Sequence, residues 1–215
     1  MDIVSRIPTF WVVLSLLALT GVRAGLSLAE KREIKDPTRI RSWGEVLESF
    51  VIAVVIVFLV VRPFMVQAFY IPSRSMTPTL SVSDRIIVNK LAYRFREPAR
   101  HEIVVFRAPR EASRGISDGE EKDFIKRVIG IPGDTIEVHG GITYRNGEPD
   151  SLACVADSVN YDLPPVTIPE GKLFVLGDNR NQSNDSHCWG VLDRELVIGK
   201  AELVFWPPNR LGGIR

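Results

Sequence analysis

Two serines that are one residue apart, Ser73 and Ser75, stand in a stretch bounded by Pro72 and Pro78. Proline fixes the φ angle and removes a backbone donor, so this segment has few conformations available to it. A serine hydroxyl held in such a segment could act as a nucleophile if another side chain takes its proton. Serine- and proline-rich turns are common without any catalytic role. The chemistry therefore depends on a proton acceptor elsewhere in the chain.

Lys126 is the candidate acceptor, because it lies in the otherwise apolar run Asp123–Gly130. Strand alternation would place Lys126 on one face with Phe124 and Val128. Burial there would lower the lysine pKa, and a reduction of roughly 2–3 units from about 10.4 costs about 3–4 kcal/mol. A neutral amine could then serve as a base. The alternative is a lysine at a strand edge whose ammonium reaches water.

A third candidate is the polar loop Gly177–His187, which directly follows the apolar run Leu173–Leu176. Long loops held by a scaffold often carry function, although Asn, Asp and Gly equally favour a solvated turn cluster. His187 is the one histidine of the three in such a neighbourhood, the others being His101 and His139. A Ser-His-Asp hydrolase would need a G-x-S-x-G-like elbow, which the sequence lacks.

The elements that must position these residues are mainly strands. Short apolar or alternating runs bounded by turn residues predict strands over 85–89, 103–106, 124–131, 135–138, 142–145, 173–176 and 203–206. Asn146-Gly147 predicts a hairpin turn, and Pro132-Gly133-Asp134 predicts another turn. Residues 109–122 are highly charged and predict an exposed loop. Residues 148–169 are polar and punctuated by prolines, so we expect a polar excursion from the core at about 144–169.

The N-terminal part has two apolar segments, residues 7–22 and 46–66. About 20 helical residues cross the roughly 30 Å hydrocarbon core, so 46–66 predicts a transmembrane helix rather than a buried core helix. The shorter segment could span, lie at the interface or be signal-like. The basic residues between Arg23 and Arg41 place that loop in the cytoplasm and everything after the helix on the exported face.

The composition limits the remaining possibilities. The 215 residues, 45% of them hydrophobic, allow one domain and a membrane anchor. A net charge of +1 gives no indication of nucleic-acid binding. The two cysteines, Cys154 and Cys188, are too few for a disulfide framework, and no Cys/His spacing is typical of a zinc site. We therefore expect no metal and no cofactor. The predicted organisation is an N-terminal region at 1–44, a transmembrane helix at 45–66 and a β-rich domain at 67–215.

Together these stretches resemble the bacterial type I signal peptidases, membrane-anchored Ser-Lys proteases that cut leader peptides from exported proteins. The resemblance runs from about Glu45 to the C-terminus. It rests on S-x-S-M-x-P-T-L at 73–80, K-R-x-x-G-x-P-G-D at 126–134 and G-D-N-R-x-x-S-x-D-S at 177–186. It implies a mainly β catalytic domain behind one or two transmembrane helices, on the outer face of the cytoplasmic membrane. Its partners would be membrane lipid and the preproteins delivered by the secretion machinery.

The resemblance also implies roles for individual residues. Ser75 would be the nucleophile and Lys126 the general base. Ser73 would donate to the oxyanion, and Ser183 would orient the lysine amine. Asp178, Arg180 and Asp185 would form the scaffold of the polar loop. Shallow apolar pockets that accept small side chains (Ala-x-Ala-like) would involve Ile71, Pro72, Met76, Leu80, Phe124 and Ile125.

Three positions depart from the pattern of that family. Arg74 and Ser83 stand where glycine is usual, and His187 stands where some relatives carry arginine as the partner of the loop's aspartate. None of these changes removes a catalytic group. The competing hypothesis is a membrane-tethered β-domain that binds partners and has lost catalysis, and the intact Ser75 and Lys126 argue against it. A Ser-Lys self-cleaving repressor would need a DNA-binding domain and a soluble chain, and the sequence shows neither.

Overall fold

The computed structural model describes residues 46, 49–50, 52–54, 65–112, 123–150, 152 and 158–214. The chain divides into two compact units, 1–66 and 67–215. The described residues of the predicted transmembrane segment, 46, 49–50 and 52–54, are α-helical. Met65 is in a turn and Val66 begins a strand, so that helix ends before Val66. Within the described ranges, no helix is both long enough and apolar enough to cross a membrane. The first apolar segment and the basic loop lie outside them.

Most of the regular secondary structure described in the second unit consists of β-strands. They are β1 (Val66–Tyr70), β2 (Arg85–Asn89), β3 (Ile103–Arg107), β4 (Asp123–Gly130), β5 (Thr135–His139), β6 (Ile142–Arg145), β7 (Glu148–Pro149), β8 (Leu163–Thr167), β9 (Lys172–Leu176), β10 (Leu192–Asp193), β11 (Val197–Trp206) and β12 (Gly212–Gly213). The helical pieces are short: the α-helix α4 (Ser186–Trp189) and the 3-10 turns η2 (Ala92–Arg94), η3 (Arg180–Gln182), η4 (Arg194–Leu196) and η5 (Pro208–Arg210).

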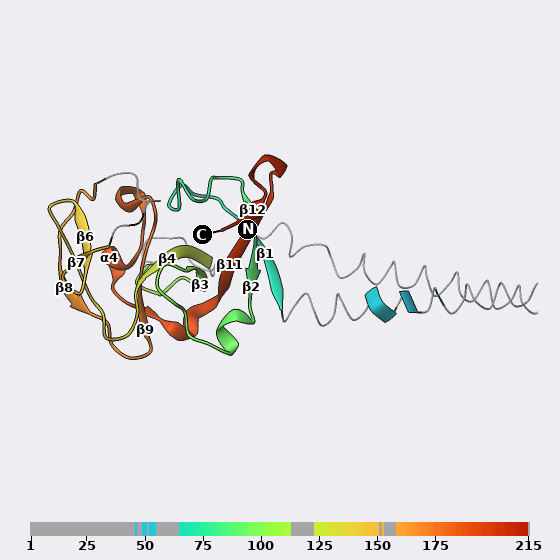
Figure 1. Ribbon diagram of the computed structural model, residues 1–215, viewed down its shortest axis with the longest axis horizontal. Helices are drawn as coiled ribbons and strands as arrows, with labels where there is room; N and C mark the ends of the chain where they lie inside the picture. Colours follow the sequence, from blue (N-terminus) through green and yellow to red (C-terminus); the bar gives the residue numbers. More distant parts are fainter. Residues whose placement is uncertain are drawn as a thin grey trace, which may run out of the picture. The chain divides into compact units, whose positions relative to one another are not determined.

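The strands form two sheets. One has the order β1-β2-β11-β3-β4-β9-β10 with β12 paired to β11, and the other has the order β7-β6-β5-β8. β4 is a central strand that pairs antiparallel with β3 and β9, and Lys126 lies opposite Val104. Figure 1 shows β6, β7 and β8 at one end of this unit and β2 and β11 toward the other. The candidate lysine therefore lies in the middle of the larger sheet.

Apolar side chains from both sheets meet in one of three core clusters. Ile129 of β4, Ile136 of β5 and Ile168 just after β8 belong to it, together with residues of β9. Gly130 makes this close packing possible, because a Cβ atom there would lie 2.2 Å from Cδ1 of Ile168. The smaller sheet is thus packed onto the strand that carries Lys126.

The structure confirms each strand that the sequence predicts, with β11 extended at its N-terminal end to Val197. It also confirms the hairpin turn, since Asn146 and Gly147 have φ angles of +56° and +79° between β6 and β7. These positive values are the ones that Asn-Gly turns require. The predicted loop 109–122 lies outside the described residues beyond Ala112.

The sequence predicted a polar excursion from the core over 148–169 and named no strand there. This stretch contains β7 and β8, and β8 pairs with β5 in the smaller sheet. β8 contains two of the prolines that punctuate this stretch, Pro164 and Pro165. β8 is an edge strand, and proline is tolerated at an edge because the missing N–H has no ladder partner to satisfy.

Candidate active site

The serine-containing loop is fixed by a hydrogen bond between its ends and by apolar side chains buried in the core. The backbone N–H of Ile71 donates to the carbonyl of Asp84 at 2.9 Å, which joins the two ends of the loop. Between them, Met76 and Leu80 are completely buried in the same core cluster as Ile71. Two apolar anchors on either side of a short turn leave the backbone little freedom. Ser75 lies between two buried residues, Ile71 and Met76, so its backbone is restricted as well.

Lys126 reaches this serine from β4. Its Nζ lies 2.9 Å from Oγ of Ser75 in a hydrogen bond and donates a second hydrogen bond to the carbonyl of Ile125, also at 2.9 Å. The ring centroid of Phe124 is 5.5 Å from the same nitrogen. The side chain of Lys126 is buried, and the residue is only 4% exposed. The structure thus brings together the two residues that the sequence singled out as nucleophile and base.

Burial changes the acid–base behaviour of this lysine. Desolvation lowers the pKa of Lys126 to about 8, and the negative charges of Asp185 and Asp178 partly oppose that reduction. Within the described residues Lys126 makes no ion pair, so no adjacent carboxylate holds the proton in place. With a pKa of about 8, about one amine in ten is neutral at pH 7. A neutral amine has the lone pair that a general base requires.

Ser73 and Ser183, to which the resemblance gives supporting roles, both lie near Ser75. Oγ of Ser73 is exposed and 3.3 Å from Oγ of Ser75. Oγ of Ser183 is buried and makes no hydrogen bond to any described residue, so its bond to Lys126 stays a prediction. Ser183 packs against Gly177, where a Cβ atom would lie 2.4 Å from Oγ of Ser183 and 2.4 Å from the carbonyl oxygen of Ser75. Only glycine fits between them.

A buried ion pair joins the polar loop to β4. Arg127 donates from Nε and a terminal nitrogen to the two carboxylate oxygens of Asp178, at 2.8 and 2.7 Å. The next residue, Asn179, donates its backbone N–H to the carbonyl of Ser75 at 3.1 Å. Sequence reasoning assigned no role to Arg127. The sequence did hold a signal: Arg127 is a second charged residue in the mostly apolar run, directly after Lys126. Asp178 of the polar loop was available as its partner.

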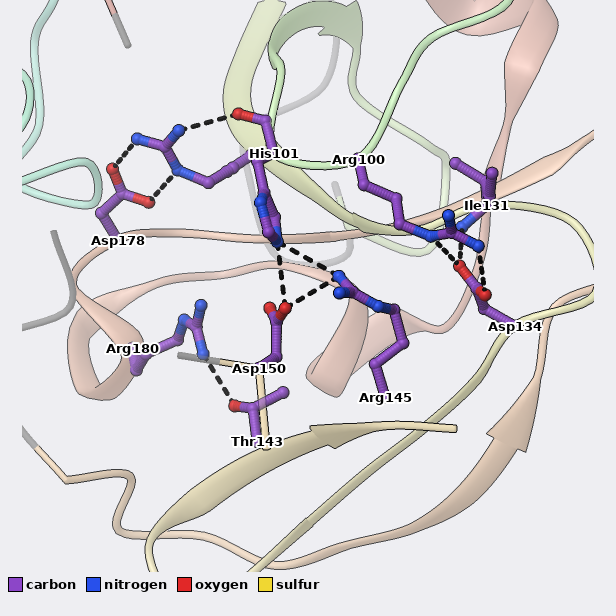
Figure 2. Close-up of polar contacts among 10 residues, drawn as sticks. Arg100, His101, Ile131, Asp134, Thr143, Arg145, Asp150, Asp178 and Arg180 are labelled. Carbon is purple, nitrogen blue, oxygen red and sulfur yellow. Dashed lines mark hydrogen bonds and ion pairs between the residues drawn. The ribbon is translucent and has the colours of Figure 1, made fainter. Parts of the chain in front are cut away.

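The polar contacts continue toward the smaller sheet, as Figure 2 shows. Arg127 donates to the carbonyl of His101 at 2.8 Å. The ring of His101 is 3.0 Å from Asp150, and Arg145 of β6 pairs with the same carboxylate at 2.8 Å. The scaffold of the candidate site therefore extends from the polar loop through β4 to the second sheet.

The remaining charged residues of the polar loop also have defined partners. Arg180 donates to the carbonyl of Gly177 at 3.1 Å and to Oγ1 of Thr143 in β6 at 2.7 Å (Figure 2). Asp185 is fully buried and accepts the backbone N–H of Gly177 at 2.9 Å. Nδ1 of His187 lies 2.7 Å from the other oxygen of Asp185. The histidine therefore pairs with the loop's aspartate.

The six apolar residues predicted around the substrate are not equally accessible. Four of them are buried: Ile71, Met76, Leu80 and Ile125. Pro72 is exposed and Phe124 is half-buried. The part of all six in substrate binding stays a prediction.

The structure accommodates the two side chains that replace glycine. Arg74 is exposed and is not among the described residues with positive φ, so its backbone is compatible with a side chain. Ser83 has a φ of +76°, a left-handed conformation that costs a non-glycine residue roughly 1–2 kcal/mol. Its hydroxyl lies 3.2 Å from that of Tyr70. Glycine at position 83 would relieve this strain.

Comparison with known proteins identifies the family to which this site belongs. The family described as "Signal peptidase, peptidase S26" matches residues 43–206, which include the serine loop, β4 and the polar loop. The chain belongs to the signal peptidase family. It is 46% identical over 158 residues to signal peptidase I of Leptolyngbya laminosa, covering 74% of this chain and 77% of that protein. It is 42% identical over 173 residues to probable signal peptidase I-1 of Synechocystis sp., covering 79% and 87%.

A crystal structure of a signal peptidase I from Enterococcus faecalis V583 is 29% identical, with a TM-score of 0.40, and covers 49% of this chain and 97% of that one. Membership of the signal peptidase family makes the chain a serine endopeptidase. Among the described residues, no three His, Cys, Asp or Glu side chains are grouped so that they could hold a metal ion.

Proposed function

We propose that the chain is a membrane-anchored signal peptidase that removes signal peptides from exported preproteins, cutting after small residues. Ser75 is the nucleophile and Lys126 the general base of this proposal. The observation that carries it is the 2.9 Å contact between Oγ of Ser75 and Nζ of a lysine that is almost completely buried.

Acylation begins with Lys126 neutral. Its lone pair takes the hydroxyl proton of Ser75 across the 2.9 Å hydrogen bond, while Oγ attacks the carbonyl carbon of the scissile bond. The amine's other hydrogen bond, to the carbonyl of Ile125, aims the lone pair at the serine. When the tetrahedral intermediate collapses, the new ammonium protonates the leaving amine of the mature protein. Lys126 is then neutral again, and the signal peptide is esterified to Ser75.

The negative charge of the tetrahedral intermediate needs donors in fixed positions. In this proposal, the backbone N–H of Ser75 and the hydroxyl of Ser73 donate to the oxyanion. Support comes from the 3.3 Å separation of the two serine hydroxyls, which places Ser73 beside the reacting oxygen. Deacylation repeats the chemistry with water: Lys126 takes a proton from the water, which attacks the ester, and returns it to Oγ of Ser75.

The test is cleavage of a model preprotein by the purified full chain in detergent. The wild-type protein should release the mature product, and Ser75→Ala should release none. The Ser75→Ala protein should melt at about the wild-type temperature, because the substitution removes one hydroxyl and no apolar contact. Near-normal cleavage by Ser75→Ala would overturn the assignment of the nucleophile. No cleavage by a folded wild-type protein would favour a domain that binds without catalysis.

The oxyanion role of Ser73 has its own test. Ser73→Ala should lower kcat by about 10²–10³-fold with little change in KM, the usual effect of removing one oxyanion donor. A raised KM with unchanged kcat would instead assign Ser73 to substrate binding.

The proposed location is the outer face of the cytoplasmic membrane, where exported preproteins emerge from the secretion machinery. Its support is the apolar segment 46–66 preceded by a basic loop, since basic loops remain in the cytoplasm. Protease added to intact spheroplasts should digest the residues that follow this segment. Complete protection of those residues would refute the proposed orientation.

A further inference from the structure

A second group of reactive side chains lies at the end of the polar loop, and the proposed peptidase mechanism does not use it. Cys188 is an exposed free thiol. Its Sγ lies 3.1 Å from Nε2 of His187, the other ring nitrogen of which lies 2.7 Å from a carboxylate oxygen of Asp185. A thiol, an imidazole and a buried carboxylate are thus aligned in series.

The carboxylate determines which ring nitrogen of His187 carries the proton. Asp185 is completely buried, and its second oxygen accepts the backbone N–H of Gly177 at 2.9 Å, so its position is fixed. A carboxylate oxygen is a hydrogen-bond acceptor, so the 2.7 Å contact is satisfied when Nδ1 of His187 carries the hydrogen. The lone pair of a neutral imidazole then lies on Nε2, which faces the thiol of Cys188.

Tyr161 holds the imidazole in this orientation. Its ring is stacked on that of His187, with centroids 4.1 Å apart and planes inclined by 11°. Burial raises the pKa of the Tyr161 hydroxyl, and the nearby charge of Asp185 raises it further. The phenol therefore keeps its proton and does not compete as a base. The imidazole is the group positioned to accept the thiol proton.

We propose that Cys188 is a reactive thiol that His187 and Asp185 activate for exchange with small disulfides. The thiol proton moves to Nε2 of His187, and the imidazolium is stabilised by Asp185. The thiolate attacks one sulfur of the disulfide, a new S–S bond forms to Cys188, and the other half leaves as a thiolate. That thiolate takes up a proton, so His187 returns to its neutral form. Because Cys188 is exposed, a small disulfide can reach it without any opening of the fold.

The experiment measures the reaction of the full chain in detergent with dithiodipyridine, an uncharged aromatic disulfide that releases an absorbing thione. Cys154→Ser provides the background, because it leaves Cys188 as the one remaining cysteine of the sequence. At pH 7 the folded protein should react about tenfold faster than the same protein unfolded in guanidinium, because unfolding abolishes the fixed 3.1 Å contact between the thiol and the imidazole that accepts its proton. Exposure alone would not favour the folded chain, because unfolding leaves a thiol fully accessible.

His187→Gln in the same background should lose most of this acceleration. The matched control is His139→Gln, which removes a histidine stacked on Tyr144 at 4.1 Å, away from any cysteine of the described residues, and should react like the parent. Equal rates for the folded and unfolded parent would overturn the proposal, as would a His187→Gln protein that reacts as fast as the His139→Gln control. If His187→Gln does not fold, the comparison of folded and unfolded parent still decides.

Discussion

Lys126 and Arg127 are consecutive residues of β4, and both are almost completely buried, with exposures of 4% and 2%. Strand alternation turns their side chains to opposite faces. Arg127 meets both oxygens of Asp178, whereas Lys126 meets a serine hydroxyl and a backbone carbonyl. Burial is the same for the two cations, and the partner is what differs. The partner is therefore what distinguishes the ion-paired cation from the one that is proposed to act as a base.

The physical chemistry of the two side chains matches these environments. A guanidinium does not lose its proton in proteins, so burying it requires a paired anion with good geometry. An amine can lose its proton instead, and desolvation lowers the pKa of Lys126 to about 8. One face of β4 thus carries a fixed charge and the other an adjustable one. The predictions below test this contrast.

The largest effect on cleavage should follow from replacing Lys126 with a cation that cannot lose its proton. Lys126→Arg should reduce preprotein cleavage by about 10⁴-fold or more, since the guanidinium cannot accept the serine proton. The measurement is cleavage of a model preprotein in detergent. Lys200→Arg is the matched control, because Lys200 is partly exposed and pairs with Glu102 at 3.0 Å, and it should retain activity. A Lys126→Arg protein with near-normal cleavage would remove Lys126 from the role of base.

Removing the fixed cation should mainly affect stability. Arg127→Met leaves Asp178 buried without its partner, and this should lower the free energy of unfolding by about 3–5 kcal/mol. Chemical denaturation in detergent measures the loss. The double variant Arg127→Met, Asp178→Leu should recover part of it, because no buried charge is then left unpaired. A single variant as stable as wild type would show that the ion pair is not needed for folding.

Removing the adjustable cation should have the opposite effect on stability. The pKa of Lys126 is lower in the folded protein, about 8, than its ordinary value of 10.5, so folding must overcome a penalty while the unfolded chain is protonated. The penalty is complete below pH 8, at about 3 kcal/mol, and disappears as pH rises through 10.5.

Lys126→Met should therefore be more stable than wild type at pH 7 and lose this advantage above pH 10.5, as measured by chemical denaturation at both values. A methionine variant that is less stable at both values would make Lys126 a paired, structural cation like Arg127.

The smallest effect concerns how the rate of preprotein cleavage depends on pH. Because only the neutral amine of Lys126 accepts the serine proton, kcat/KM should rise about tenfold per pH unit up to about pH 8 and then level off. His187→Gln should show the same rise of kcat/KM with pH, since the rise reflects the deprotonation of Lys126. A rise that disappears with His187 would mean that the titrating base is a histidine. Initial cleavage rates at low preprotein concentration give the profile directly.

The proposed nucleophile and base could be singled out from the sequence because each has a strong local context. Ser75 stands between prolines, and Lys126 follows Phe124 and Ile125 in a mostly apolar strand. The strands were predictable for a similar reason, since short alternating runs ended at turn residues such as Asn146-Gly147. Local pattern decided these features, and the structure agrees with it wherever it describes them.

The pairing of Arg127 with Asp178 could not be predicted in the same way. The partners are 51 residues apart in the sequence, and only the register of β4 against β9 brings them together. The contact between His187 and Cys188 depends on a one-turn helix capped by Asp185, which no periodicity indicates. β8 was not predicted because proline is compatible with an edge strand but not with a central one. Which of the two a strand becomes depends on the tertiary fold.

The prolines of the smaller sheet affect whether other polypeptides could pair with its edges. Its two outer strands, β7 and β8, contain Pro149 and the pair Pro164-Pro165. An unprotected sheet edge offers N–H and C=O groups to any extended chain that comes near. Exported preproteins, the proposed substrates, would arrive as such chains. Proline has no backbone N–H to donate to an additional strand. Extended preproteins would therefore pair poorly with these edges and would not be retained there.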